Sequence, residues 1–260
     1  IMGAGILGLP YAYANTGWLF GIIFQLMALY FSVTGCQLLS YCTSVTKQPG
    51  SFYTVVSAVN KKLTPVVDVV VFCMTFGVGV AYLISIGDLM PKSLSSLCCT
   101  EELLTDRLTW VFLGWCFAVP FSCMHNIDAL KWTSGICFLF LIFNTFLVVI
   151  YSMPNSLDAC ADQDLDDDSE PCRGDKNVLP TDATGFIKVF SIFIFALGCQ
   201  TNAFAFLNEL ETPTTTRIKN LFRVSITSAA AIYILFGCSS YSTYGASIHS
   251  DSIINYPAKD

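Results

Sequence analysis

Charged residues are scarce in this chain of 260 residues. Asp, Glu, Lys and Arg together make up 12% of the sequence, about half the share typical of soluble domains. The net charge of −6 comes mainly from residues 158–182, which hold nine acids against two bases, so the sequence offers no basic surface for nucleic acid. Histidine occurs only twice, and no apolar segment groups the His, Asp, Glu and Ser residues that an enzyme would need. The sequence therefore predicts neither a nucleic-acid-binding protein nor an enzyme.

Long stretches of the chain contain no charge at all. Residues 1–46 have no Asp, Glu, Lys or Arg, and similar runs cover residues 69–87, 132–157, 189–208 and 224–250. Each approaches or exceeds the roughly 20 residues that an α-helix needs to cross a hydrocarbon core of about 30 Å. Together with the 54% hydrophobic content, this pattern predicts an all-α polytopic membrane protein whose main surroundings are the lipid bilayer.

Seven membrane elements are expected along the chain. The first is a half-helix that ends in a turn at residues 15–17, and Pro91 is expected to end the third element. Residues 214–220 are expected to be a polar linker, residues 246–260 a loop, and residues 51–59 a short surface helix. The later six elements are predicted at residues 19–42, 66–90, 108–124, 130–153, 186–208 and 221–245.

Glycines interrupt the apolar run at the start of the chain. Gly3, Gly5 and Gly8 precede Pro10 in a segment without charge. One interpretation is close packing of helices through small residues, for which Gly3 and Gly8 are the candidates. The other is a helix break, which is tolerated at membrane depth only where protein or a water-filled cavity surrounds the freed backbone groups. A half-helix amino end beside such a break is suited to a carboxylate. The pattern alone leaves both interpretations open.

The sixth element is also interrupted, by the small and polar residues 198–202. Two interrupted elements separated by four uninterrupted ones are typical of inverted-repeat transporters. On this basis, the whole of residues 1–260 is one transmembrane transporter domain, with a first repeat at 1–153, an acidic loop at 154–184 and the start of a second repeat at 185–260. Because the chain opens on Ile inside an apolar element, we expect it to be a fragment.

Two of the twelve cysteines lie in the acidic loop, whereas most of the others are scattered through the apolar spans. Cys160 and Cys172 are expected to form a disulfide that closes a short loop. Such a bond favours a non-cytosolic, oxidising side for the loop.

Several motifs along the whole chain resemble the amino-acid/auxin permease family, nearest to its branch of neutral amino-acid transporters, which includes sodium-coupled and vacuolar carriers. The longest match is the first-helix motif at residues 1–12 followed by Ala14-Asn15-Thr16-Gly17. Shorter matches lie at residues 82–84, 86–91, 120–122, 131–134, 195–200, 208–210 and 244–245.

The resemblance implies a leucine-transporter-like inverted-repeat fold, of which this chain would cover about the first seven of roughly eleven transmembrane helices. It also implies a secondary active transporter that moves neutral amino acids, coupled to a sodium or proton gradient, with no cofactor. The membrane would be the plasma membrane or the vacuolar or lysosomal membrane. A membrane amino-acid sensor using the same binding site is the alternative, and protein partners are not indicated.

The resemblance further assigns the substrate site to the two interrupted elements. Backbone amides of the first would hold the substrate carboxylate, while the broken sixth helix would offer carbonyls to the amino group and side chains to the rest of the substrate. The third element would line the opposite wall. The expected substrate-binding residues are Gly3, Ala4, Gly5, Ile6, Val80, Tyr82, Phe195, Gly198, Cys199 and Asn202. Carbonyls of Ile1 and Ala4 would be sodium ligands, and Gln200 stands where many sodium-coupled relatives have His.

Overall fold

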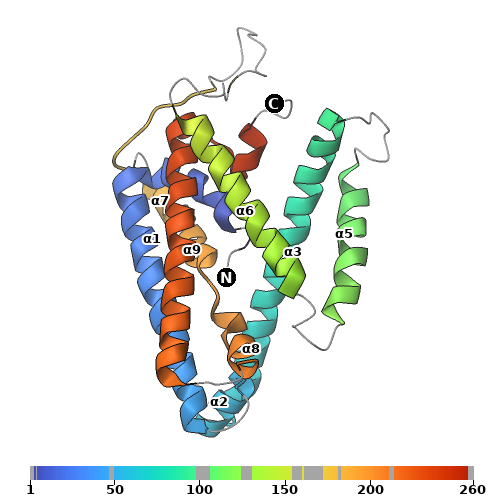
Figure 1. Cartoon of the computed structure of the whole chain (residues 1–260), viewed down its shortest axis with the longest axis vertical. Coiled ribbons are helices and arrows are strands. Elements are labelled where there is room, and N and C mark those ends of the chain that lie inside the picture. Colours follow the sequence, from blue (N-terminus) through green and yellow to red (C-terminus); the bar gives the residue numbers. More distant parts are fainter. Residues whose placement is uncertain are drawn as a thin grey trace.

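The computed structural model describes residues 3, 5–46, 50–97, 106–123, 131–153, 160, 172–180, 183–210 and 214–256. All regular structure in these ranges is helical (Figure 1). Five helical stretches are long and apolar enough to cross a membrane: Gly5–Thr46, Thr64–Leu94, Thr133–Ser152, Thr184–Asn208 and Thr215–Ser247. The chain is therefore a multi-pass membrane protein, as its composition predicts.

Helix α1, Gly5–Thr46, contains both the predicted half-helix and the second predicted span. The two parts meet at Gly17, whose φ of 73° and ψ of 171° are not helical, in a region that glycine adopts without strain. The backbone amides of Trp18 and Leu19, just after the kink, donate hydrogen bonds to the carbonyls of Asn177 and Val178, each at 3.2 Å. The expected turn is thus present, and a distant loop satisfies the amides it exposes.

Helices α2, Phe52–Val59, and α3, Thr64–Leu97, follow. Ser51 caps α2 by accepting a hydrogen bond from the Thr54 amide, which matches the predicted surface helix. Pro91 lies inside α3, so the prediction that it ends this element is wrong. Proline removes one donor, but membrane helices tolerate it because neighbouring side chains, waters or local changes of winding satisfy the freed backbone group.

The next helices are α5, Arg107–Ser122, and α6, Lys131–Ser152. The sixth predicted element is divided into α7, Ala183–Ala196, the 3₁₀ turn η2, Gln200–Asn202, and α8, Ala203–Asn208. Figure 1 shows α7 and α8 displaced along the long axis and joined by a non-helical connection.

Helix α9, Thr215–Tyr244, begins six residues before its predicted start at residue 221. The expected polar linker at residues 214–220 is therefore wrong: its Thr, Arg and Lys side chains are compatible with a helical turn that extends beyond the hydrocarbon layer. The 3₁₀ turns η3, Gly245–Ser247, and η4, Ser252–Asn255, complete the described chain.

Helix α1 forms the centre of the bundle by packing on α7 and α9, and α6 covers another side of α9. The largest fully buried side chains include Tyr13, Phe193, Tyr233 and Phe236. Helices α3 and α5 pack on each other as a pair beside this bundle (Figure 1). Their outward apolar side chains are mostly exposed, which is the surface expected of helices that contact lipid.

Candidate functional site

The interruption of the sixth element lies at Leu197, Gly198 and Cys199, between α7 and η2. The Gly198 amide donates to the Phe195 carbonyl at 3.1 Å, and the Cys199 amide donates to the Leu197 carbonyl at 3.0 Å. These short-range bonds replace the regular helical pattern. The prediction of a broken helix near residue 198 is confirmed by this geometry, while any role of the break in binding stays a prediction.

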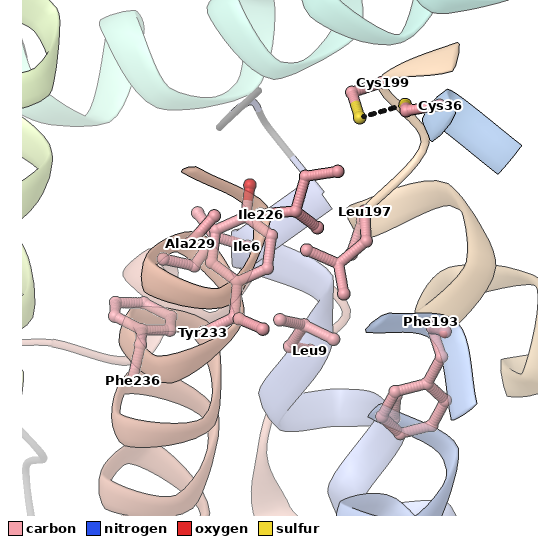
Figure 2. Close-up of a cluster of buried hydrophobic side chains, with 14 of the residues drawn as sticks. Ile6, Leu9, Cys36, Phe193, Leu197, Cys199, Ile226, Ala229, Tyr233 and Phe236 are labelled. Atoms are coloured by element: carbon pink, nitrogen blue, oxygen red, sulfur yellow. Dashed lines mark hydrogen bonds between the residues drawn. The ribbon is translucent and has the colours of Figure 1, made fainter. Parts of the chain in front are cut away.

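The second half of α1 holds the break from one side. Ser32 donates a hydrogen bond of 2.7 Å to the Leu197 carbonyl, and its hydroxyl lies 3.5 Å from the Cys199 sulfur. The Cys36 sulfur, one turn further on, is also 3.5 Å from that sulfur (Figure 2). All four side chains are buried. Since a buried carbonyl without a partner costs roughly 1–3 kcal/mol, Ser32 stabilises the irregular backbone.

The lower end of the broken element is anchored separately. Asn208, the last residue of α8, accepts a hydrogen bond of 2.8 Å from the Gly50 amide and donates one of 2.9 Å to the Gly50 carbonyl. The Asn208 amide group thus pairs with both backbone groups of Gly50 and joins the end of α8 to the segment before α2. Both sides of the break are therefore tied to the α1–α2 part of the chain.

The amino end of α1 lies directly against the end of α7. A Cβ atom added at Gly5 would lie 2.7 Å from the Ala196 Cα and 3.3 Å from its Cβ, so the two backbones touch. Ile6 and Leu197 belong to one buried cluster with Ile226 of α9 (Figure 2). The packing interpretation of the first glycines therefore holds at Gly5, and the chain is helical from Gly5 on, so a helix break is not present at Gly5 or Gly8. This packing places the amino end of α1 against the irregular residues 197–199.

Gly3 precedes α1 and is not helical. Its amide donates a hydrogen bond of 3.0 Å to the hydroxyl of Tyr233 on α9. On its other side, a methyl group at Gly3 would collide with the hydroxyl of Tyr82 on α3. Two tyrosine hydroxyls from different helices thus converge on the backbone just before α1.

A cavity of about 520 Å³ opens beside this point, between α1, α3, α7 and the segment after η3. Gly5 and Phe195 are among its lining residues, and Asp88 and Asp251 contribute carboxylates. The Arg107 Nε lies 2.8 Å from the Asp88 Oδ1, so Asp88 is ion-paired. Burial raises the pKa of Asp251, and the negative charge of Asp88 adds to this effect. The remaining lining residues are Leu7, Gly8, Ala81, Ile84, Ser85, Ser191, Ile192 and Ser250.

The predicted site residues fall into three groups. Gly3, Gly5, Ile6, Tyr82, Gly198 and Cys199 lie at or beside the start of α1 or the break after α7, and Phe195 lines the cavity. Val80 is 39% exposed on α3 and does not line this cavity. Asn202 is exposed, with its amide bonded to the Cys199 carbonyl. Ile1 and Ala4 lie outside the described residues, so the predicted sodium ligands have no described geometry.

Three residues of the site were not expected from the sequence: Ser32, Cys36 and Tyr233. For the first two a signal exists, because Gly21, Gln25, Ala28, Ser32, Cys36 and Ser40 form a buried stripe at intervals of three and four residues along α1. All of these except Gln25 are small, and small residues allow close approach of a neighbouring membrane helix. Tyr233 carries no comparable signal, since it is one of several aromatic residues in its helix.

The structure joins Cys160 and Cys172 by a disulfide, the pairing expected from the sequence. The chain after Cys172 is attached to the end of α9: the Gly174 amide donates to the Tyr244 carbonyl at 2.8 Å, and the Ala246 amide to the Asp175 carbonyl at 3.0 Å. The acidic residues between the cysteines lie outside the described residues.

A multi-pass bundle with an irregular helix segment packed against the end of another helix in its interior has the architecture typical of membrane transporters. The family model described as "Transmembrane amino acid transporter protein" matches residues 1–260, so the chain belongs to this family of amino acid transporters.

Curated relatives in this family carry transporter names. The chain is 28% identical over 256 residues to "Vacuolar amino acid transporter 5" of Schizosaccharomyces pombe, covering 98% of the chain and 57% of the relative. It is 28% identical to "Vacuolar amino acid transporter 7" of Saccharomyces cerevisiae, covering 98% of the chain and 50% of the relative. It is 26% identical to human "Sodium-coupled neutral amino acid transporter 7", covering all of the chain and 55% of the relative. The chain thus spans about half the length of these relatives. No solved structure matches it at a significant level.

Proposed function

We propose that this chain is part of a secondary active transporter of neutral amino acids, driven by a sodium or proton gradient. Its fold would be the leucine-transporter-like inverted repeat, with a first repeat at residues 1–153, a non-cytosolic loop at 154–184 and a second repeat that starts at 185. On this proposal the chain covers about the first seven of roughly eleven membrane helices. The relatives named for vacuolar and for sodium-coupled neutral amino acid transport support the substrate class.

The observation that carries the proposal is the contact between the amino end of α1 and the broken α7–α8 element. Gly5 approaches the Ala196 backbone, and the non-helical residues 197–199 begin at that contact. Amides in the first turn of a helix have no partner within that helix, and the helix dipole favours an anion there. Carbonyls at the break, each with two lone pairs, offer acceptors to an ammonium group. A zwitterion is therefore the ligand that this pair of segments fits.

The hydrogen bonds refine the assignment of the four amides expected to bind the carboxylate. The Gly3 amide donates to Tyr233, and the Ile6 amide donates to the Gly3 carbonyl at 3.3 Å. In this conformation two of the four are engaged within the protein. In our proposal Ala4 and Gly5 provide direct amide contacts, and carbonyls of Ile1 and Ala4 contribute to a sodium site. Movement of the α1, α7 and α9 bundle against α3 would then open the site to alternate sides.

Uptake into proteoliposomes tests the proposal. The full-length protein is reconstituted, and labelled glutamine and alanine are offered with sodium and pH gradients imposed separately. Accumulation above the equilibrium level under one gradient only is the expected result and identifies the coupling ion. Binding of the same amino acids without uptake under either gradient contradicts the transporter and favours the sensor.

A further inference from the structure

Tyr233 occupies a position at the proposed site that neither the resemblance nor the comparisons assign. It lies on α9, 230 residues from Gly3 in the sequence, and its side chain has no exposed surface. Figure 2 shows it between α9 and the start of α1, near Ile6 and Ile226. Its hydroxyl oxygen accepts a hydrogen bond from the Gly3 amide, with 3.0 Å between the nitrogen and the oxygen. The ring is thus held by apolar packing, while its polar end reaches the backbone at the amino end of α1.

The Tyr233 hydroxyl has one hydrogen-bonding function left over. A phenolic hydroxyl carries one proton to donate and also accepts. The bond from Gly3 uses an acceptor position, and among the hydrogen bonds of the described residues none takes up the Tyr233 proton. A buried donor without an acceptor is unfavourable, so an acceptor supplied by a ligand would be stabilised here.

The groups around the Tyr233 hydroxyl favour an acceptor with a negative charge. The positive end of the α1 dipole lies at the same place, and the donors gathered there are N–H and O–H groups. A bond from the Gly3 amide polarises the Tyr233 hydroxyl and strengthens its own donation, because hydrogen bonds in a chain are cooperative. A carboxylate, which only accepts, fits this chain of donors.

We propose that Tyr233 is a substrate-binding residue whose hydroxyl accepts a hydrogen bond from the Gly3 amide and donates one to the carboxylate of the amino acid. The hydrogen bonds run from the Gly3 N–H to the Tyr233 oxygen, and from the Tyr233 O–H to a carboxylate oxygen. No proton is transferred and Tyr233 stays neutral. This inference rests on the proposed function, in that it names the group that recognises the carboxylate within the same site.

The decisive comparison is Tyr233→Phe with Tyr241→Phe in the full-length protein. Tyr241 is an equally buried tyrosine on α9, but its hydroxyl bonds to the backbone of Asn177, accepting at 2.8 Å and donating at 3.3 Å. Binding is measured from the stabilisation against heat that alanine and alanine methyl ester produce, and uptake of alanine is measured in parallel. The ester keeps the ammonium group and lacks the carboxylate charge.

Loss of a hydrogen bond to a charged group corresponds to roughly a tenfold to hundredfold weaker affinity. We expect Tyr233→Phe to weaken alanine binding and raise the KM for alanine by about this factor, with the ester affected much less. Tyr241→Phe should leave the affinities of both ligands unchanged. An equal loss for alanine and its ester, or an alanine affinity within twofold of the parent, overturns the proposal. If the parent binds alanine with these properties and fails to accumulate it, the transport proposal fails and the role of Tyr233 stands.

Discussion

The contact between Gly5 and Ala196 gives the sharpest test of the fold. An alanine at position 5 places its Cβ 2.7 Å from the Ala196 Cα, 3.3 Å from the Ala196 Cβ and 3.4 Å from the Ala196 amide nitrogen. The nearest atom belongs to the backbone and cannot rotate away, so α1 and α7 must separate. Overpacking of this kind costs about 1–3 kcal/mol. We therefore expect Gly5→Ala to lower the free energy of unfolding by this amount.

Other glycines of the chain provide matched controls. A Cβ at Gly8, one turn along α1, would lie 3.4 Å from the Ile192 Cγ2, an ordinary van der Waals distance, and a Cβ at Gly79 on α3 would meet nothing within 4 Å. Gly8→Ala should be between neutral and about 1 kcal/mol stabilising, because the same gain in helix stability applies there and the contact is not overpacked. Gly79→Ala should stabilise the protein by about 0.5–1 kcal/mol, because alanine loses less conformational entropy than glycine in a helix.

Unfolding of the purified protein in mixed micelles, followed by tryptophan fluorescence, measures these differences. A double variant with Ala196→Gly adds information, because it removes the Cβ at position 196 and leaves the Cα. It should therefore recover only part of the lost stability. A Gly5→Ala variant as stable as Gly79→Ala would refute the close approach of α1 and α7, and with it the basis of the proposed site. Gly5→Val adds a larger side chain at this contact, so a loss of function in that variant would report disturbed packing of α1 on α7 and would not isolate carboxylate binding.

Three further predictions concern the surroundings of the site. Ser32→Ala leaves the buried Leu197 carbonyl without its donor and should cost about 1–3 kcal/mol in the same unfolding measurement; a change below 0.5 kcal/mol, within the range of ~0.5 kcal/mol for neutral surface changes, would contradict it. Cys36 and Cys199 have sulfurs 3.5 Å apart, so a thiol oxidant such as diamide should join them, and mass spectrometry of the digested protein should detect the linked peptides. Absence of these peptides, under conditions in which the oxidant does react with the thiols of the denatured protein, would contradict this geometry. Because burial raises the pKa of Asp251 above its usual 3.8, the stability that its protonated form contributes is lost as the pH rises through the raised value. Asp251→Asn should therefore flatten the dependence of Tm on pH above about 4, and an unchanged profile would contradict the burial of this carboxyl.

The sequence predicts those parts of the fold that are determined by residues close together in the chain. Gly17 between two apolar stretches predicts the kink in α1, and the small and polar run from Gly198 predicts the break after α7. The expectation for Pro91 fails because a rule for helices in water does not hold for a helix in lipid. The early start of α9 has a related cause. The polar residues near Thr215 predict a linker, but a membrane helix can continue past the hydrocarbon layer.

The contacts that form the candidate site could not be predicted in this way, because they join residues far apart in the chain. Ser32 meets Leu197 across 165 residues, and Gly3 meets Tyr233 across 230. Periodicity identifies the face of a helix that is buried but does not identify its partner. The buried stripe on α1 predicts that another helix approaches closely, yet only the structure identifies the residues just after α7 as the neighbours of Ser32 and Cys36.

The two interpretations of the first glycines describe successive parts of one arrangement. Gly5 removes the Cβ that would keep α1 and α7 apart, and Gly3, two residues earlier, lies outside the helix with its amide directed to Tyr233. Without the close approach at Gly5, the amino end of α1 and the carbonyls of the broken segment would be too far apart to contact one small ligand. A variant that separates the helices should therefore weaken binding of the carboxylate and the ammonium group together. Tyr233→Phe should weaken recognition of the carboxylate alone, so the alanine and ester affinities distinguish damage to the packing from the loss of one ligand contact.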